Sequence, residues 1–158
     1  MADQAQLAML KGSVTEWNQW REANPDAQVD LTKVYLVRAE LRGANLSAAS
    51  LTGANLIGAD LSRTNLTRAN LTGADLSEAG LAGADLSEAN LYRANLSEAN
   101  LHEANLRGAD LRVARLTQVN LTKANLRGAK LTQANVYRAN LRGAKLAGAT
   151  MPDGKIHK

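Results

Sequence analysis

The chain has 158 residues, a net charge of +4 and no cysteine. This length fits one domain, and the lack of cysteine excludes disulfides and thiolate chemistry and gives no sign of an oxidising compartment. No run of residues reaches the apolar length of a membrane span, and the N-terminus shows neither the basic start nor the apolar stretch of a signal peptide. We therefore expect a protein of the cytoplasm.

The first 28 residues do not follow the pattern of the rest of the chain, and they predict a helical cap. Residues 3–11 are expected to form a short helix. Ser13 is expected to begin a second helix as its N-cap, with Glu16 reaching back to it in a capping box. Three apolar side chains recur at three-residue spacing along that second helix, namely Val14, Trp17 and Trp20. We interpret them as a lid over the open end of the structure that follows, because such an end invites aggregation; a ligand-binding pair of tryptophans is the alternative.

From residue 29 to residue 151 the chain repeats a five-residue unit: Ala, then Asn or Asp, then Leu, then two variable residues. On an α-helix, residues five apart point about 140° away from each other, so the leucines would form no apolar stripe. In one straight strand they would alternate between the two faces. The chain must therefore turn after each Leu so that every Ala and Leu points inward. The sequence predicts an all-β solenoid.

The residues at the expected turns agree with this prediction. The second position after the central Leu holds Gly nine times between Leu41 and Gly148, and Gly accepts the positive φ that tight turns require. Ser and Thr often precede it, where hydroxyls bond nearby backbone. The outward Asn or Asp is expected to bond its own turn or the like residue on the next coil.

This repeated unit resembles that of the pentapeptide repeat proteins, in particular the cyanobacterial members. Some of those also carry a Trp-bearing N-terminal helix, and many end in Met-Pro-Asp-Gly, as this chain does at residues 151–154. In that family four units, or twenty residues, make one turn of a right-handed quadrilateral β-helix. The resemblance implies about six such coils over residues 29–151, a cap over residues 1–28 and a tail over residues 152–158.

The C-terminal end of the expected coil is poorly covered. Pro152 ends strand pairing there, and Ile156 is the only large apolar residue that follows. As in some members of the family, we expect that two such ends can meet in a two-fold homodimer.

Charge is strongly segregated along the chain. Residues 75–103 carry a net charge of −5, whereas residues 104–158 carry +9. With twenty residues per turn, the bases of the second segment surround the rod and form no single groove, and few aromatic residues lie among them, which disfavours nucleic acid as a ligand. We regard them as a candidate surface for an acidic protein partner, with a merely solvated surface as the alternative; they are Arg107, Arg112, Arg115, Lys123, Arg127, Lys130, Arg138, Arg142 and Lys145.

Three classes of function remain, and the first is a rigid, non-catalytic scaffold that presents its surface to a protein partner. The second follows from the resemblance, since some family members protect DNA gyrase and mimic DNA with a strongly negative surface. Those members often carry projecting loops or a C-terminal dimer module, and neither is present in this unbroken register.

An enzyme is the third class. His102 and Glu103 are neighbours, but the spacing supplies no third converging group, so we predict no catalytic residue, no metal site and no cofactor.

Overall fold

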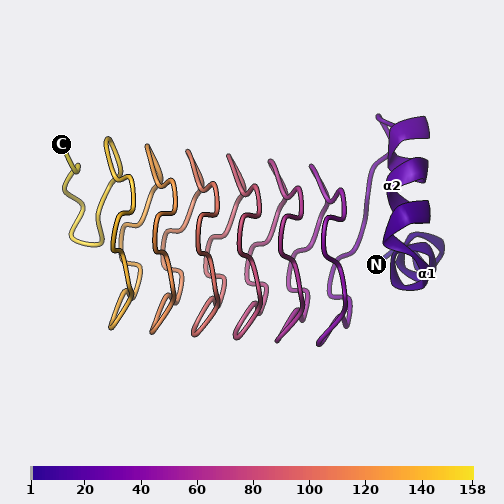
Figure 1. Ribbon diagram of the computed structural model, residues 1–158, viewed down its shortest axis with the longest axis horizontal. Coiled ribbons are helices and arrows are strands. Elements are labelled where there is room, and N and C mark those ends of the chain that lie inside the picture. The colour runs from indigo at the N-terminus through magenta and orange to yellow at the C-terminus, as the bar shows by residue number, and fades with distance from the viewer. Residues whose placement is uncertain (1) are drawn as a thin grey trace.

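The computed structural model describes residues 2–158, so that Met1, which belongs to the expected cap, lies outside the described residues. Figure 1 shows a rod built from a stack of similar turns, with two helices at its N-terminal end and the C-terminus at the opposite end. Neither helix has the length and apolar character that crossing a membrane requires, as far as the described residues go.

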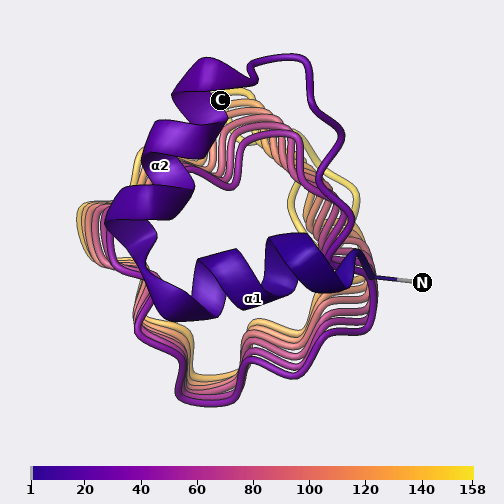
Figure 2. The same ribbon diagram turned by 90° about the vertical axis from the view of Figure 1, so that its right-hand side faces the viewer.

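Parallel β-bridges join the residue before each central Leu to the residue twenty positions later. Four series of bridges run along the rod, and we number its sides by the first residue of each series: side 1 from Asp30, side 2 from Tyr35, side 3 from Glu40 and side 4 from Asn45. Each bridge involves a single residue per coil, so no extended strand forms within residues 2–158. The result is a right-handed quadrilateral β-helix with twenty residues per turn, seen end-on in Figure 2.

The core consists of the inward Ala and Leu residues, as the repeat predicts. Leu46, Leu76 and Leu101 have no exposed surface, and the same is true of most other central leucines. Thr64 replaces an inward Ala and is also fully buried. Its hydroxyl is satisfied because it donates to the carbonyl oxygen of Leu41 on the previous coil at 3.1 Å, as a buried hydroxyl requires.

Every turn of the coil uses a left-handed residue at the second position after the central residue. The nine glycines do so, as expected, but fifteen other residues adopt the same conformation, including Val113 with a φ of 62°. The neighbouring coils hold this conformation in place, since the backbone N–H of Val113 donates to Thr132 O at 3.0 Å. The outward residues bond both their own turn and the next coil, as predicted: Ser62 N–H donates to Asp60 Oδ1 at 2.9 Å, and Asn95 Nδ2 donates to Asp75 Oδ1 at 3.1 Å.

The cap consists of α1 (Gln4–Gly12) and α2 (Val14–Ala23). Ser13 is the N-cap of α2, and its hydroxyl accepts from the Glu16 N–H at 3.2 Å, as predicted. The other half of the expected capping box is absent, because the Ser13 N–H donates to Met9 O instead, at 3.1 Å. The end of α1 therefore uses the donor that Glu16 was expected to satisfy.

Three apolar side chains of α2 lie toward the coil. Trp17 is completely buried, while Val14 and Trp20 are half-buried and pack against the same core. The two indole rings have their centres 5.2 Å apart at an angle of 39°. This geometry agrees with the interpretation of α2 as a lid.

Candidate interaction surface

Side 4 carries three of the candidate bases close together. The outward residues Asn105, Asn125 and Lys145 follow one another in its series of bridges, and Arg107 and Arg127 each lie two positions after one of the asparagines. A hollow of about 370 Å³ lies beside them. Its lining includes Arg107, Arg127 and Gly128, where an added Cβ would have no atom within 4 Å. Glu88 also lines it, and its carboxylate is paired with Arg68.

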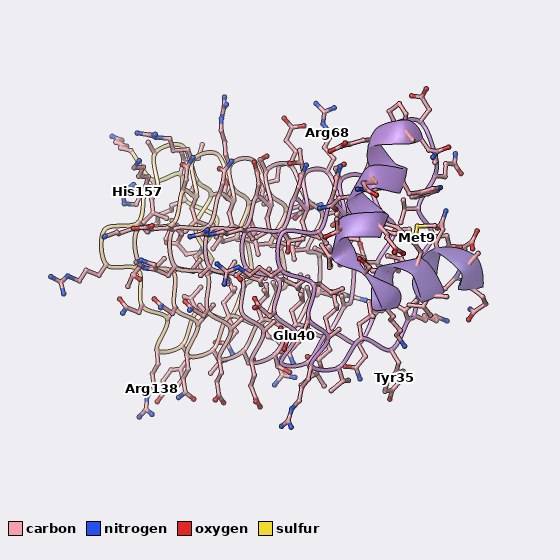
Figure 3. The ribbon with its side chains drawn as sticks, turned by 45° about the vertical axis from the view of Figure 1, so that its right-hand side comes forward. Met9, Tyr35, Glu40, Arg68, Arg138 and His157 are labelled. Atoms are coloured by element: carbon pink, nitrogen blue, oxygen red, sulfur yellow. The ribbon has the colours of Figure 1, made fainter. Side chains whose placement is uncertain are left out.

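The other six candidate bases occupy the remaining three sides, two on each, and all are exposed. Figure 3 shows Arg138 projecting from the C-terminal part of the rod, far from the helices. The bases thus surround the rod, as the twenty-residue register predicts. Their positions by side are Arg112 and Lys130 on side 1, Arg115 and Arg138 on side 2, and Lys123 and Arg142 on side 3.

Two of the nine bases are neutralised by acidic neighbours. The guanidinium of Arg112 binds both carboxylate oxygens of Asp110, the shortest contact being 2.6 Å, and this hydrogen bond holds the pKa of Asp110 below its usual value although burial opposes it. Lys123 Nζ lies 3.1 Å from Glu103 Oε1 on the previous coil. Among the described residues, the other seven bases form no ion pair, and they carry the uncompensated positive charge.

The acidic segment that precedes them is partly used for stacking. Glu88 accepts from Arg68 Nε at 2.8 Å, and Asp85 accepts from Asn105 Nδ2 at 3.1 Å. Both partners lie twenty residues away, on a neighbouring coil. Much of the negative charge therefore faces a donor of the same protein. Residues 104–145, the basic half of the rod, are thus the more strongly charged surface.

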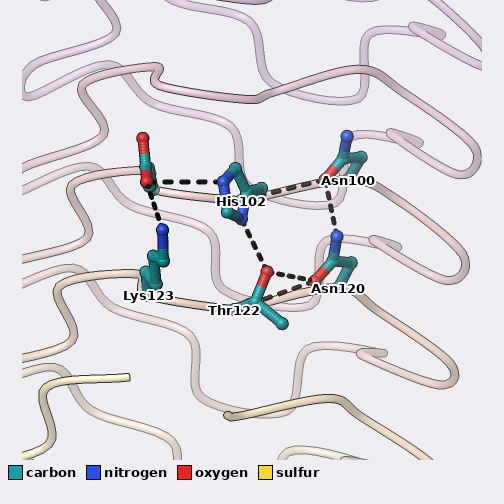
Figure 4. Close-up of polar contacts among 6 residues, drawn as sticks. Asn100, His102, Asn120, Thr122 and Lys123 are labelled. Atoms are coloured by element: carbon teal, nitrogen blue, oxygen red, sulfur yellow. Dashed lines mark hydrogen bonds and ion pairs between the residues drawn. The ribbon is translucent and has the colours of Figure 1, made fainter. Parts of the chain in front are cut away.

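His102 lies in a polar cluster that the sequence spacing did not show (Figure 4). Its Nδ1 is 2.7 Å from the hydroxyl oxygen of Thr122 on the next coil, and its Nε2 is 3.4 Å from Glu103 Oε1. The structure thus aligns a carboxylate, an imidazole and a hydroxyl, the three groups of a hydrolytic triad. The contact between His102 and Thr122 could have been inferred from the sequence, because the two residues are twenty positions apart and therefore lie on successive coils.

The surroundings of this cluster do not support nucleophilic catalysis. The hydroxyl of Thr122 donates to Asn120 Oδ1 at 2.8 Å, so its proton is directed away from the imidazole that would have to remove it. The nearest backbone donors are also occupied, since Thr122 N–H bonds Asn120 Oδ1 and Lys123 N–H bonds Arg142 O. The N–H groups of His102 and Glu103 are bonded as well, so that none of these four described residues has a backbone N–H left to stabilise an oxyanion. Within residues 2–158, no group of three or more His, Asp or Glu side chains could hold a metal ion.

The junction between cap and coil depends on two polar residues that sequence reasoning missed. Asn18 accepts from Asn45 N–H at 2.8 Å and donates to Gly43 O at 3.0 Å. Arg21 is buried, which lowers the pKa of its guanidinium, and it donates to Ala27 O and Ser47 O. Arg21 lies four positions after Trp17, one turn along the same face of α2, and that spacing was the available signal.

Together these features define a non-globular repeat protein, a four-sided β-solenoid closed at one end by helices. The family model of pentapeptide repeats matches this chain in eight copies, over residues 27–63, 44–79, 74–112 and 109–148. The chain belongs to the pentapeptide repeat family, as its repeated unit predicted.

Solved structures of this family resemble the chain. It is 32% identical to the pentapeptide repeat protein Rfr23 from the cyanobacterium Cyanothece 51142, with a TM-score of 0.68 and coverage of 84% of this chain and 95% of that one. It is 42% identical to HetL from the cyanobacterium Nostoc sp. PCC 7120, a protein involved in the regulation of heterocyst differentiation, with a TM-score of 0.35 and coverage of 83% and 65%. A comparison with curated proteins found no match.

Proposed function

We propose that this protein is a rigid, non-catalytic scaffold whose basic half, residues 104–145, binds an acidic protein partner. The observation that carries the proposal is the set of seven exposed bases without an ion pair among the described residues, next to a segment whose acids largely bond the protein itself. Side 4 is the centre of the proposed surface, because Arg107 and Arg127 lie on successive coils and line the same hollow.

The coil suits such a role because its backbone is fixed. Each interior coil is hydrogen-bonded to the coil before and the coil after it, so that side chains are presented on a surface that does not need to be ordered on binding. Pre-ordering lowers the entropic cost of association. Complementary charge mainly raises the association rate and the selectivity, and both decrease as salt rises.

A capture experiment tests this proposal. The wild-type protein and a variant with Arg107→Glu and Arg127→Glu are used as bait in extracts of the native cell, and Arg42→Glu with Arg63→Glu provides a control with the same change of charge. We expect acidic partners that bind the wild type and the control but not the first variant, and that elute as salt rises. Identical sets of captured proteins for all three baits would refute the proposal.

We also propose that two molecules meet through their C-terminal ends. Val136, Leu141 and Leu146 are only half-buried there, and their backbone N–H groups form no hydrogen bond among the described residues. Among the described residues, the tail pairs with Thr150 on side 1 through Ile156, and His157 bonds Gly148 and Ala149 at the adjoining end of side 4. Light scattering at tens of micromolar protein is expected to give the mass of a dimer for the wild type and of a monomer for Leu141→Glu. A wild-type protein that is strictly monomeric would contradict this proposal.

A further inference from the structure

Within residues 2–158, the cap forms hydrogen bonds with the first coil on side 1, on side 4 and at the end of side 3. On side 1, Asp3 N–H donates to Asp30 O at 2.8 Å, and Asp30 N–H donates to Gln6 Oε1 at 2.9 Å. On side 4, Trp17 and Asn18 bond the backbone of Asn45. Asn18 Nδ2 also donates to Gly43 O at 3.0 Å, three residues after Glu40 on side 3. Among the described residues, side 2 receives no hydrogen bond from the cap.

Side 2 therefore ends in an open β-edge. Among the described residues, the N–H and C=O of Tyr35 and the C=O of Val37 form no hydrogen bond. The equivalent groups one coil further on are all bonded: Asn55 N–H donates to Val34 O at 2.9 Å, while Asn55 O and Ile57 O accept from the coil before them at 2.8 Å. The three free groups thus have the geometry of a coil that lacks its neighbour.

The side chains around this edge are unusual for a solvated surface. Tyr35 is 71% exposed and Val37 is 43% exposed, and Figure 3 shows Tyr35 projecting from the rod below the helices. A hollow of about 550 Å³ between α1 and this side is lined in part by Leu7 and Val34. An apolar side chain of a segment bound along this edge could enter the hollow.

The charges beside the edge favour one sign of ligand. Lys33 and Arg38 are exposed at its two ends and form no ion pair among the described residues. Glu40 is the nearest acid in sequence and belongs to side 3. An extended segment with carboxylates at its ends would therefore meet a base at each end of the edge.

We propose that the open edge of side 2 binds an extended acidic segment of a partner protein, which adds to the first coil as one further parallel strand. Tyr35 N–H donates to a carbonyl of the segment, and the carbonyls of Tyr35 and Val37 each accept from it. One face of the segment fills the hollow beside Leu7, because side chains alternate along a strand. Main-chain bonds supply the affinity and the flanking charges supply the selectivity, as in other cases of strand addition.

Fluorescence anisotropy with defined peptides tests this inference. The probe is a labelled seven-residue peptide that alternates Asp and Val. It is compared with two N-methylated forms, one methylated at the odd-numbered amides and one at the even-numbered amides (the two N-methylation registers), and with a peptide in which Lys replaces each Asp. The protein is the full chain, as wild type, as Lys33→Glu with Arg38→Glu, and as Arg107→Glu with Arg127→Glu. Glu already occupies the same left-handed turn position at residues 78 and 88, so the first pair of substitutions is compatible with the fold.

We expect saturable binding of the Asp-Val peptide that is at least tenfold weaker for one of the two N-methylation registers, for the Lys-Val peptide and for the Lys33→Glu, Arg38→Glu variant. The change at Arg107 and Arg127 is expected to alter it less than threefold. No binding at millimolar concentration, or equal binding of both N-methylated registers, would overturn the inference. So would loss of binding only at Arg107 and Arg127, which would instead assign acidic peptides to the basic half. Self-association that Tyr35→Glu abolishes, without peptide binding, would assign the edge to a second copy of the chain.

Discussion

The indole Nε1–H of Trp17 donates to the backbone carbonyl of Asn45 at 2.8 Å, and this bond joins the cap to the first coil. Trp17 is completely buried, so its indole N–H has this carbonyl as its partner in place of water. Trp17→Phe keeps most of the apolar contact and removes the donor, and we expect it to lower the stability of the cap by about 1–2 kcal/mol. Trp17→Ala should cost about 3–5 kcal/mol.

Denaturant unfolding is the measurement for the cap, with far-UV circular dichroism of α1 and α2 as the signal in every variant. Trp20→Phe is the matched control, because Trp20 is half-buried and its indole N–H forms no hydrogen bond among the described residues. It should lower the stability less than Trp17→Phe does. Equal losses in the two variants would show that the bond to Asn45 contributes nothing.

A second prediction concerns the left-handed turn at Val113. A β-branched residue with a φ of 62° is strained, whereas Asn tolerates this region. We expect Val113→Asn to raise the free energy of unfolding by about 1 kcal/mol. Gly128→Val makes the opposite kind of change, because it places a β-branched residue at a φ of 66° with no atom within 4 Å of its Cβ. It should lower the free energy of unfolding by about 1–2 kcal/mol. Thermal melts followed by circular dichroism test the pair, and a change of the same sign in both variants would contradict the strain argument.

A third prediction concerns stability in acid. Hydrogen bonds from Ser62 and from Arg112 hold the pKa values of Asp60 and Asp110 below the usual value. A carboxyl with a lowered folded-state pKa adds stability above its unfolded pKa of about 4, and this stability is lost as pH falls through the folded pKa. Unfolding measured between pH 6 and pH 2 should therefore show stability falling below about pH 4. Asp60→Asn with Asp110→Asn keeps the turn acceptors and should flatten that fall; an unchanged slope would show that other carboxyls dominate.

A fourth prediction concerns the His102 cluster. Because the Thr122 proton is directed to Asn120, the hydroxyl is not an activated nucleophile. Hydrolysis of p-nitrophenyl acetate should be equally slow with the wild type, with Thr122→Val and with His102→Gln. A rate that falls more than tenfold in both variants would make the cluster catalytic and would contradict our account of it.

A fifth prediction separates the scaffold from a DNA mimic. Glu88 and Glu103 are paired with Arg68 and Lys123, and the following half of the rod is strongly basic, so attraction to a DNA-binding surface is weak or reversed. We expect a molar excess of the protein to leave supercoiling by DNA gyrase unchanged. Inhibition, or protection of gyrase from a quinolone, would favour mimicry.

The sequence predicted the coil well because its signal is repeated in every unit. The inward Ala and Leu, the outward Asn and Asp and the lid residues Val14, Trp17 and Trp20 all lie where their spacing indicated. Val113 and the other left-handed non-glycine residues were not foreseen, because the neighbouring coils impose that conformation and the local residue does not. The capping box was half wrong for a similar reason, since α1 ends so close to α2 that it takes the Ser13 N–H.

Contacts between coils were the harder part of the site. Arg107 and Arg127 were placed correctly from a separation of twenty residues, yet the pairing of Lys123 with Glu103 and the contact of His102 with Thr122 depend on how side chains bend between coils. Periodicity gives the position of a Cα atom and does not give the direction of a long side chain. The pair of Lys123 with Glu103 between coils, and the pair of Arg112 with Asp110 within one turn, leave seven of the nine predicted bases without an ion pair among the described residues.

The basic interaction surface can be tested with a captured acidic partner, whose affinity is measured by calorimetry at two salt concentrations. We expect binding at least tenfold weaker for Arg107→Glu with Arg127→Glu than for the wild type, little change for Arg42→Glu with Arg63→Glu, and weaker binding at the higher salt concentration. Equal affinities for the three proteins, unaffected by salt, would contradict a basic interaction surface on this rod.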